Sequence, residues 1–154
     1  MPAALVEKIK KAAHFNQGYA LTEVLAAATL DMEWHELAKD ANVTDSDQFE
    51  TAALKKTHLD LPQVPPRYRS SYFLHIWGNG YSAGYYAYLW TEMLDDDAFQ
   101  WFEENGGLTR ANGDRFRELI LSRGNTAEYG DMFKAFRGRA PSIEAMLKNR
   151  GLKK

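Results

Sequence analysis

Apolar residues recur every three or four positions along most of this chain, which is the periodicity of helices that bury one face. Residues 21–37 are apolar on almost every side, and this pattern predicts a deeply packed helix. The same periodicity predicts further helices over these ranges: 3–15, 47–58, 98–105, 109–122, 127–136 and 142–149. Residues 69–73 are the one candidate for a strand. The pattern therefore predicts an all-α fold.

One segment interrupts the helical pattern. Residues 61–66 read LPQVPP. Each residue before a proline is disfavoured in the α region, so this segment is expected to be extended. The whole chain has 154 residues, which fits one domain with a sizeable core. We therefore expect a single helical domain over residues 1–154, with an extended break at 61–66.

The aromatic residues concentrate in residues 72–90, which read YFLHIWGNGYSAGYYAYLW. Gly78 and Gly80 flank an asparagine there, and two glycines so close together predict a flexible turn in place of a helix. The second half has helical spacing, with Tyr81, Tyr85 and Tyr88 expected on one face. His75 enters the turn from the other side. The pattern predicts a row of phenols and an imidazole directed toward one point.

Two interpretations of this stretch stay open from the residues alone. Aromatic residues at helical spacing usually belong to a core, so the stretch can be a buried helix end. Three phenol groups on one face would then each need a hydrogen-bond partner. In the second interpretation, a glycine turn beside the phenols lets the backbone of a ligand approach closely.

Composition narrows the function classes. The formal net charge of −2 gives no support for nucleic-acid binding, and no apolar run approaches the length of a membrane span. The absence of cysteine excludes disulfides, a thiolate nucleophile and cysteine-based zinc sites. No signal peptide is recognisable at the start, and a cytoplasmic setting is expected.

The sequence lacks a metal-binding motif of its own. Residues His35 and Glu36 resemble the start of an HExxH zinc helix, but Lys39 occupies the position of the second histidine. No other histidine has a ligand at the spacing that zinc requires, so no metal ligand is predicted. The three aspartates at 95–97 are predicted to be a solvated helix cap. No nucleophile elbow or phosphate loop is present.

Two longer strings carry a family resemblance: PPRYRSSYFLHIWGNGYSAGYYAYLWTEMLDDDAFQWF and GGLTRANGDRFRELILSRGN. They resemble the C-terminal region of bacterial dipeptidyl carboxypeptidases, which are peptidyl-dipeptidases of the thimet oligopeptidase family of zinc metallopeptidases. The opening residues 1–35 resemble the segment before it, so the likeness covers essentially the whole chain. Its most specific part is the His-x-x-Gly-x-Gly-Tyr turn with the tyrosines that follow.

The resemblance implies an α-helical fold whose two halves enclose a deep channel, with the zinc-binding HExxH helix upstream of this sequence. It implies that a zinc-bound water attacks a peptide carbonyl and that residues of this chain stabilise the resulting negative charge. His75 and Tyr88 are the catalytic candidates. The substrate-binding candidates are Tyr81, Tyr85, Gly78 and Gly80. Asn79 stands where relatives often have glycine, and asparagine tolerates positive φ.

These inferences lead to one expected function and one alternative. The expected function is to bind oligopeptides and stabilise the transition state in an enzyme that removes C-terminal dipeptides. The expected partners are the oligopeptide substrate and an upstream metallopeptidase half that carries zinc. The isolated chain, which lacks that half, is expected to be inactive and to self-associate. The alternative is a non-enzymatic helical module that binds peptides or a partner protein.

Overall fold

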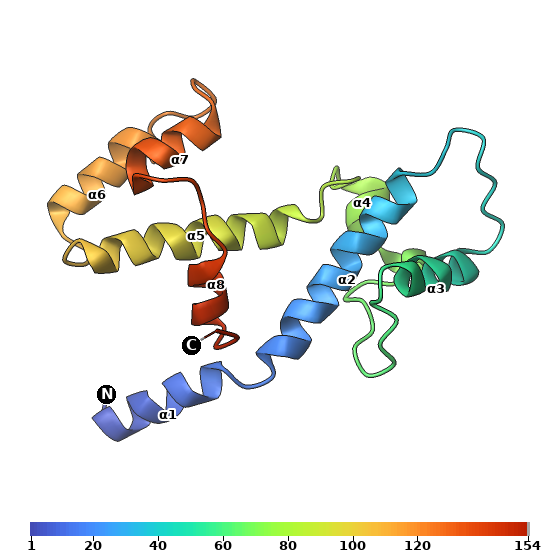
Figure 1. Cartoon of the computed structure of the whole chain (residues 1–154), viewed down its shortest axis with the longest axis horizontal. Coiled ribbons are helices and arrows are strands. Elements are labelled where there is room, and N and C mark those ends of the chain that lie inside the picture. The colour runs from blue at the N-terminus through green and yellow to red at the C-terminus, as the bar shows by residue number, and fades with distance from the viewer. Residues whose placement is uncertain (154) are drawn as a thin grey trace. The chain divides into compact units, whose positions relative to one another are not determined.

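The computed structural model describes residues 1–153, and helices joined by loops make up that range, without a strand. This confirms the all-α prediction (Figure 1). The α-helices are α1 (Ala3–Ala13), α2 (Gln17–His35), α3 (Ser46–Lys56), α4 (Leu74–Gly78), α5 (Ala87–Glu104), α6 (Arg110–Phe116), α7 (Tyr129–Arg137) and α8 (Glu144–Asn149). Two short elements complete the set: the 3₁₀ helix η1 (Ser70–Tyr72) and the π-helix η2 (Arg117–Leu121). No helix in the described range is long and apolar enough to cross a membrane.

The chain divides into two compact units, Met1–Trp90 and the residues from Thr91 onward. The non-helical segment 61–66 lies inside the first unit. The expectation of a single domain over the whole chain stays a prediction.

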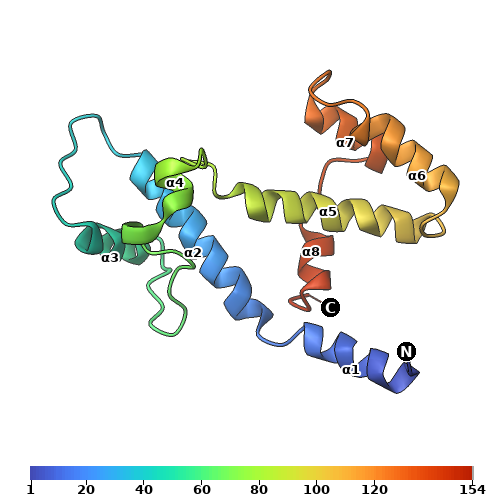
Figure 2. The same cartoon turned by 180° about the vertical axis from the view of Figure 1, so that it is seen from behind.

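The first unit is built around α2. Its core cluster consists of Ala27, Ala28, Phe73, Ile76 and Tyr85. Small alanines on α2 let the aromatic rings of the later segment approach closely, and α4 accordingly lies against α2 in the views of Figures 1 and 2. Helix α3 packs on α2 and on η1. The apolar surface of α2 is thus explained by its packing against residues that lie about fifty positions later in the chain.

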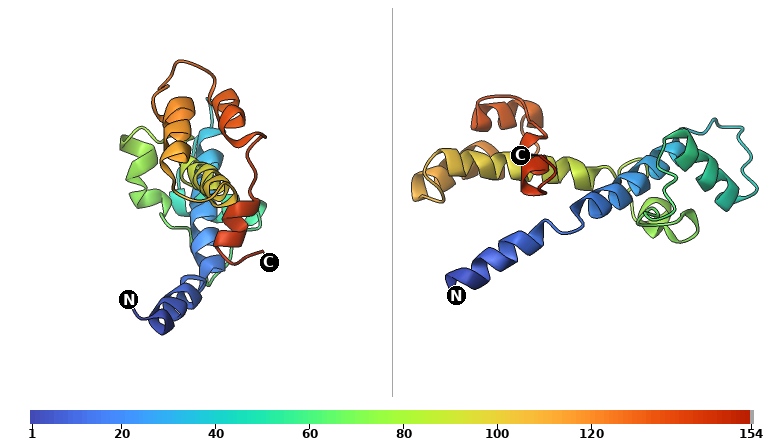
Figure 3. Two further views of the ribbon diagram at one scale, coloured as in Figure 1. Left: turned by 90° about the vertical axis from the view of Figure 1, so that its left-hand side faces the viewer. Right: turned by 60° about the horizontal axis from the view of Figure 1, so that its bottom comes forward.

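Helix α1 differs from α2 because none of its residues is buried within the described range. It ends before Asn16, which has a left-handed backbone with φ of 58°. Figure 3 shows α1 and α2 as two helices with a bend between them. Leu5 and Ile9 remain about half exposed, at 46% and 51%.

The second unit has its own core, formed by Ala98, Phe102, Phe133 and Phe136. In this unit α6 continues into η2, and η2 packs on α7. Figures 1 and 2 show α6 and α7 side by side. Helix α8 is held to α5 by the ion pair between Arg150 and Glu92, with the Nε to Oε1 distance at 2.6 Å.

The helix predicted at 109–122 is present as α6 and η2, so its last turn is π-helical.

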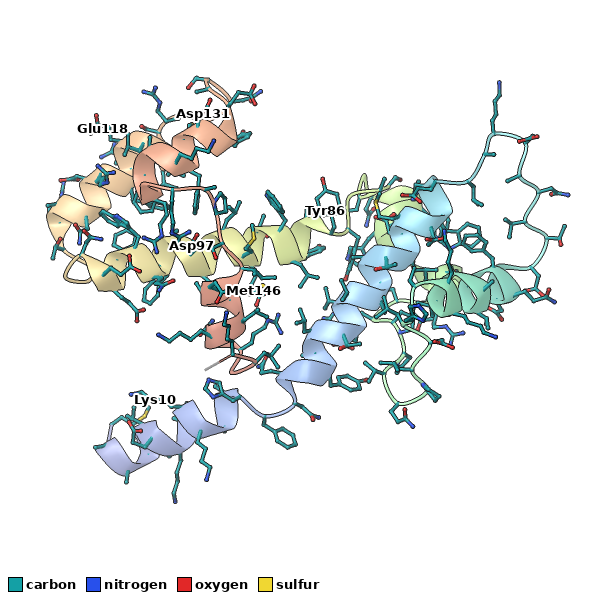
Figure 4. All side chains as sticks on the ribbon, in the orientation of Figure 1. Lys10, Tyr86, Asp97, Glu118, Asp131 and Met146 are labelled. Carbon is teal, nitrogen blue, oxygen red and sulfur yellow. The ribbon has the colours of Figure 1, made fainter. Side chains whose placement is uncertain are left out.

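The prediction of a solvated cap at residues 95–97 is wrong. Helix α5 runs through this segment, and Asp97, labelled in Figure 4, is fully buried in its middle. The buried carboxylate is tolerated because Arg137 and Arg139 both donate hydrogen bonds to it. The candidate strand at 69–73 is also wrong, because η1 occupies most of it.

Candidate functional site

Four of the predicted site residues come together in the first unit: His75, Tyr81, Tyr85 and Tyr88, here named the aromatic cluster. Ring centroids of His75 lie 5.9 Å from Tyr81, 5.4 Å from Tyr85 and 6.4 Å from Tyr88. Tyr88 in turn lies 5.6 Å from Tyr81 and 4.9 Å from Tyr85. The imidazole and the three phenols therefore converge on one place, as the sequence predicted.

The predicted route to this convergence is wrong, since the three tyrosines do not share one helix. Helix α5 begins at Ala87, and residues 82–86 form a turn. Ala83 has a φ of 53°, in the left-handed region that non-glycine residues rarely occupy. This backbone reversal brings Tyr81 back beside Tyr88, and the two rings stack at an interplanar angle of 9°.

The three phenols differ in exposure. Tyr81 and Tyr88 are 37% and 43% exposed, whereas Tyr85 is only 3% exposed. Burial is the main reason that the pKa of Tyr85 rises to about 12, and the neighbouring Tyr68 adds to the rise. The pKa of Tyr88 is also raised, chiefly by its side-chain hydrogen bond with Tyr81. Tyr85 and Tyr88 are thus neutral hydrogen-bond donors near pH 7, and the rings of Tyr81 and Tyr88 face solvent.

The core interpretation of the aromatic stretch describes only part of it, and the ligand interpretation stays a prediction. Tyr85 belongs to the core together with Phe73, whose ring centroid lies 4.8 Å away. Tyr81 and Tyr88 lie at the edge of that core with accessible rings. The stretch therefore combines a packed base with an exposed phenol pair.

The glycine turn is shorter than predicted. Helix α4 includes His75 and extends to Gly78, although this half of the stretch was predicted not to be helical. Asn79 has a φ of −115°, so it does not use the positive φ that it could tolerate. Gly80, in contrast, has a positive φ of 78°. Gly80 is thus the one residue of 78–80 with a positive φ, and Gly78 ends a single helical turn.

His75 is held between aromatic rings. Its ring centroid lies 4.7 Å from that of Tyr68, in addition to its three neighbours in the aromatic cluster. The Nδ1 atom is enclosed and has no hydrogen-bond partner within residues 1–153. The backbone carbonyl of His75 accepts a hydrogen bond from the Tyr81 N–H at 3.1 Å, which joins α4 to the turn.

Two residues that matter at this site were not found from the sequence. Asp31 on α2 is fully buried and accepts hydrogen bonds from the N–H groups of Ala83 and Tyr85, both at 2.9 Å. Tyr68 contacts both His75 and Tyr85. A signal existed for Asp31, because a carboxylate on a helix that is apolar almost all round must find partners when it is buried.

The described residues do not fit a zinc ion. No group of three or more His, Cys, Asp or Glu side chains in residues 1–153 could hold a metal. His35 turns its Nδ1 toward Asp31, 2.9 Å from Oδ1 and 2.8 Å from the carbonyl oxygen. Both neighbours are acceptors, so this nitrogen carries a proton and the residue serves the packing around Asp31.

Sequence comparison places these features in a family. The model of peptidase family M3 matches residues 1–152. The chain belongs to peptidase family M3, a family of zinc metallopeptidases.

Individual relatives agree with this assignment. The chain is 58% identical over 152 residues to dipeptidyl carboxypeptidase of Salmonella typhimurium and 57% identical to that of Escherichia coli. It is 36% identical over 154 residues to oligopeptidase A of Escherichia coli. Each match covers 99% of this chain but 22% of the relative. The chain thus spans about a fifth of the length of these relatives.

Proposed function

We propose that this chain is the substrate-binding and transition-state-stabilising region of a dipeptidyl carboxypeptidase, and that it acts on oligopeptides together with an upstream, zinc-carrying half. The observation that carries the proposal is the exposed phenol pair, Tyr81 and Tyr88, stacked beside His75. Family membership and the similarity to two dipeptidyl carboxypeptidases support it. A cytoplasmic location and the absence of nucleic-acid partners remain predictions.

The chemistry of the cluster suits peptide hydrolysis. Negative charge develops on the carbonyl oxygen when a peptide bond is attacked, and positioned donors stabilise that charge more than they stabilise the uncharged carbonyl. Tyr88 and His75 are the donors assigned to this oxygen. In this proposal Tyr81 lines the substrate side, Tyr85 supports the cluster from the core, and the chain near Gly78 and Gly80 contacts the peptide backbone. The raised pKa of Tyr88 keeps its proton available as the charge grows.

The protonation states support these roles at neutral pH. Tyr85 has a pKa of about 12, so it remains uncharged at neutral pH. Its buried ring packs against the ring of Tyr88. In His75 the enclosed Nδ1 leaves Nε2 as the nitrogen that would meet a ligand.

The first experiment uses the isolated chain. Because the described residues hold no metal-binding group, we expect no peptidase activity and no stoichiometric zinc after dialysis. Peptidase activity from the purified chain, or one tightly held zinc per chain, would contradict this part of the proposal.

The second experiment tests the role of Tyr88. The matching 152 residues of the Salmonella dipeptidyl carboxypeptidase are replaced by this chain, and Tyr88→Phe is introduced into the chimera. Loss of a donor to an oxyanion typically lowers kcat by about 10²–10³. KM should change much less, because ground-state binding depends little on that hydrogen bond.

Tyr86→Phe is the matched control for this experiment. Tyr86, labelled in Figure 4, lies on the same turn and is 51% exposed, and in the described structure no ring contact joins it to the aromatic cluster. Its kcat should be unchanged. If Tyr88→Phe has a normal kcat, Tyr88 is a packing residue and the proposal loses its catalytic donor. A chimera that binds peptides without hydrolysing them would favour the non-enzymatic helical module instead.

A further inference from the structure

Asp31 is a charged residue on the buried face of α2. Its side chain has no solvent exposure, and the neighbouring Ala27, Ala28 and Leu30 are buried around it. An ionised carboxylate remains in such a place only when several donors satisfy it. The reason for its presence must therefore be sought in what it binds.

The partners of Asp31 are concentrated on one short turn. Its Oδ1 accepts the N–H of Ala83 and its Oδ2 accepts the N–H of Tyr85, each at 2.9 Å. Both carboxylate oxygens are thus used to hold backbone amides two residues apart. His35 lies on the same helix and adds a third donor from its Nδ1, 2.9 Å from Oδ1.

The turn that Asp31 holds is strained. Ala83 has a φ of 53°, a conformation that is unfavourable for a residue with a Cβ atom. Strained residues persist where the surrounding structure over-determines them, and they concentrate at functional sites. Two further hydrogen bonds fix the entrance of this turn, from Ser82 Oγ to the Ile76 carbonyl at 2.6 Å and from the Tyr81 N–H to the His75 carbonyl.

The geometry of the phenols follows from this turn. The chain direction at residues 82–86 decides where Tyr81 lies relative to Tyr88, which is on the first turn of α5. Without the reversal at Ala83 the two rings would not stack. We infer that Asp31 is a positioning residue: its carboxylate holds the strained 82–86 turn and so directs the hydroxyl groups of Tyr81 and Tyr88 toward a peptide substrate. This inference rests on the proposed function of the cluster.

Asp31→Asn is the most informative change because it keeps the shape and removes one acceptor. The amide of asparagine has one oxygen and one NH₂ group, and the NH₂ group cannot accept a hydrogen bond. One of the two backbone N–H groups, of Ala83 or Tyr85, therefore loses its partner. The turn should loosen there while the apolar contacts of α2 remain.

The first measurement uses this chain and needs no activity. Amide hydrogen exchange is compared at Ala83 and Tyr85 in the original chain, in Asp31→Asn and in a control, Asp114→Asn. Asp114 is exposed and pairs with Arg110 on α6, so its change removes the same charge away from the turn. We expect exchange at one of the two amides or both to be at least about tenfold faster in Asp31→Asn only, because the lost hydrogen bond gave protection. Unchanged exchange would overturn the inference.

The second measurement uses the chimera described above. A misplacement of about 1 Å at a reacting group can cost about 10²-fold in rate, so Asp31→Asn should lower kcat by at least about tenfold with little change in KM. The double variant Asp31→Asn, Ala83→Gly should recover much of that loss, because glycine adopts positive φ without strain. A purely structural Asp31 predicts a lower melting temperature with no such rescue of kcat, and that result would overturn the inference.

A variant that leaves Asp31 intact covers the case in which Asp31→Asn does not fold. Ala83→Val increases the strain at the turn, because β-branched residues strongly disfavour positive φ, and it should also lower kcat. A normal kcat in Ala83→Val would count against the inference.

The two proposals fail in different ways. A normal kcat in Tyr88→Phe removes the catalytic role of Tyr88 from the proposed function, whatever the result for Asp31→Asn. A reduced kcat in Tyr88→Phe with an unaffected Asp31→Asn removes only the positioning role.

Discussion

The rings of Tyr81 and Tyr88 stack with their centroids 5.6 Å apart and nearly parallel, at 9°, although the chain between them is a turn. The side-chain hydrogen bond between the two phenols is the largest cause of the raised pKa of Tyr88. This hydrogen bond favours the neutral form of Tyr88 over the phenolate and so raises the pKa. Tyr88 is thus tied to Tyr81 in the free chain.

We expect Tyr81→Phe to lower the pKa of Tyr88 toward the ordinary value of about 10, because phenylalanine removes the hydrogen-bond partner and keeps the ring. Burial also contributes to the raised pKa, so the shift should be partial. The measurement is an NMR titration of the tyrosine ring carbons of the chain at alkaline pH. Tyr86→Phe is the control and should leave Tyr88 unchanged. An identical titration midpoint for Tyr88 in the original chain and in Tyr81→Phe would refute the assignment.

The second prediction concerns Gly80. Its φ of 78° lies in the region that disfavours a Cβ atom, so Gly80→Ala should destabilise the first unit by about 1–2 kcal/mol. Space does not limit this site, because no atom lies within 4 Å of the position that the alanine Cβ would take. The free energy of unfolding, measured with urea, reports the change.

Gly18→Ala is a control that should change the free energy of unfolding in the opposite direction. Gly18 lies within α2 and also has no atom within 4 Å of the added Cβ position. Alanine is favoured over glycine inside a helix by about 0.5–1 kcal/mol, so this variant should be more stable. A destabilisation of equal size in both variants would show that backbone strain at Gly80 is not the cause.

The third prediction concerns the uncovered face of α1. Leu5 and Ile9 on this helix and Phe15 after it are 46%, 51% and 78% exposed. Exposed apolar groups favour association, so the isolated chain should form dimers or larger species as its concentration rises. Sedimentation velocity over a range of concentrations tests this. Ile9→Glu should weaken the association. Lys10→Glu is the control, at the neighbouring exposed position labelled in Figure 4; it removes no apolar surface and should leave the association unchanged. A strictly monomeric chain at millimolar concentration would contradict the prediction.

Local periodicity was sufficient to predict much of the fold. Helix α2 was expected at 21–37 and spans Gln17–His35, because its apolar residues recur with helical spacing. The convergence of His75 with the three tyrosines was also expected, and the structure contains it. A short-range pattern carries this information because the residues concerned lie within a few turns of chain.

The route of the chain through the site could not be predicted in the same way. Tyr81, Tyr85 and Tyr88 have the spacing of one helix face, but the partner that breaks the helix is Asp31, about fifty residues earlier. Periodicity holds no information about an acceptor so far away. The same limit explains the wrong prediction at residues 95–97. Three acidic residues in a row resemble a helix cap, and the sequence pattern does not show that Arg137 and Arg139 pair with Asp97.

The last prediction concerns Asp97. Arg139 donates to its carboxylate at 2.6 Å and 2.8 Å, Arg137 donates at 2.8 Å, and the Ser142 N–H donates at 2.9 Å. Burial alone would raise the pKa of this carboxyl, but the hydrogen bonds from Arg139, Arg137 and Ser142 outweigh burial and lower it. The ionised carboxylate is therefore favoured in the folded second unit relative to the unfolded chain.

The sign of the pH dependence follows from this lowered pKa. The unfolded chain binds a proton at Asp97 with a pKa of about 3.9, so the stabilisation is fully present above that pH. It is lost as the pH falls through the lower pKa of the folded state. We expect Asp97→Asn to destabilise the second unit by about 1.5–3 kcal/mol at pH 7, because the nearly buried Arg137 loses this partner and keeps Glu104. The difference from the original chain should shrink below about pH 4.

Urea unfolding followed through Trp101, which packs on Phe136 in the core of this unit, measures the difference at each pH. Asp114→Asn is the control, because its ion pair with Arg110 is exposed and contributes at most about 1 kcal/mol. A difference between Asp97→Asn and the original chain that stays constant from pH 7 to well below pH 4 would mean that the lowered pKa does not stabilise the fold. Asp97 would then act through its shape, by filling the space between α5 and the segment that follows α7.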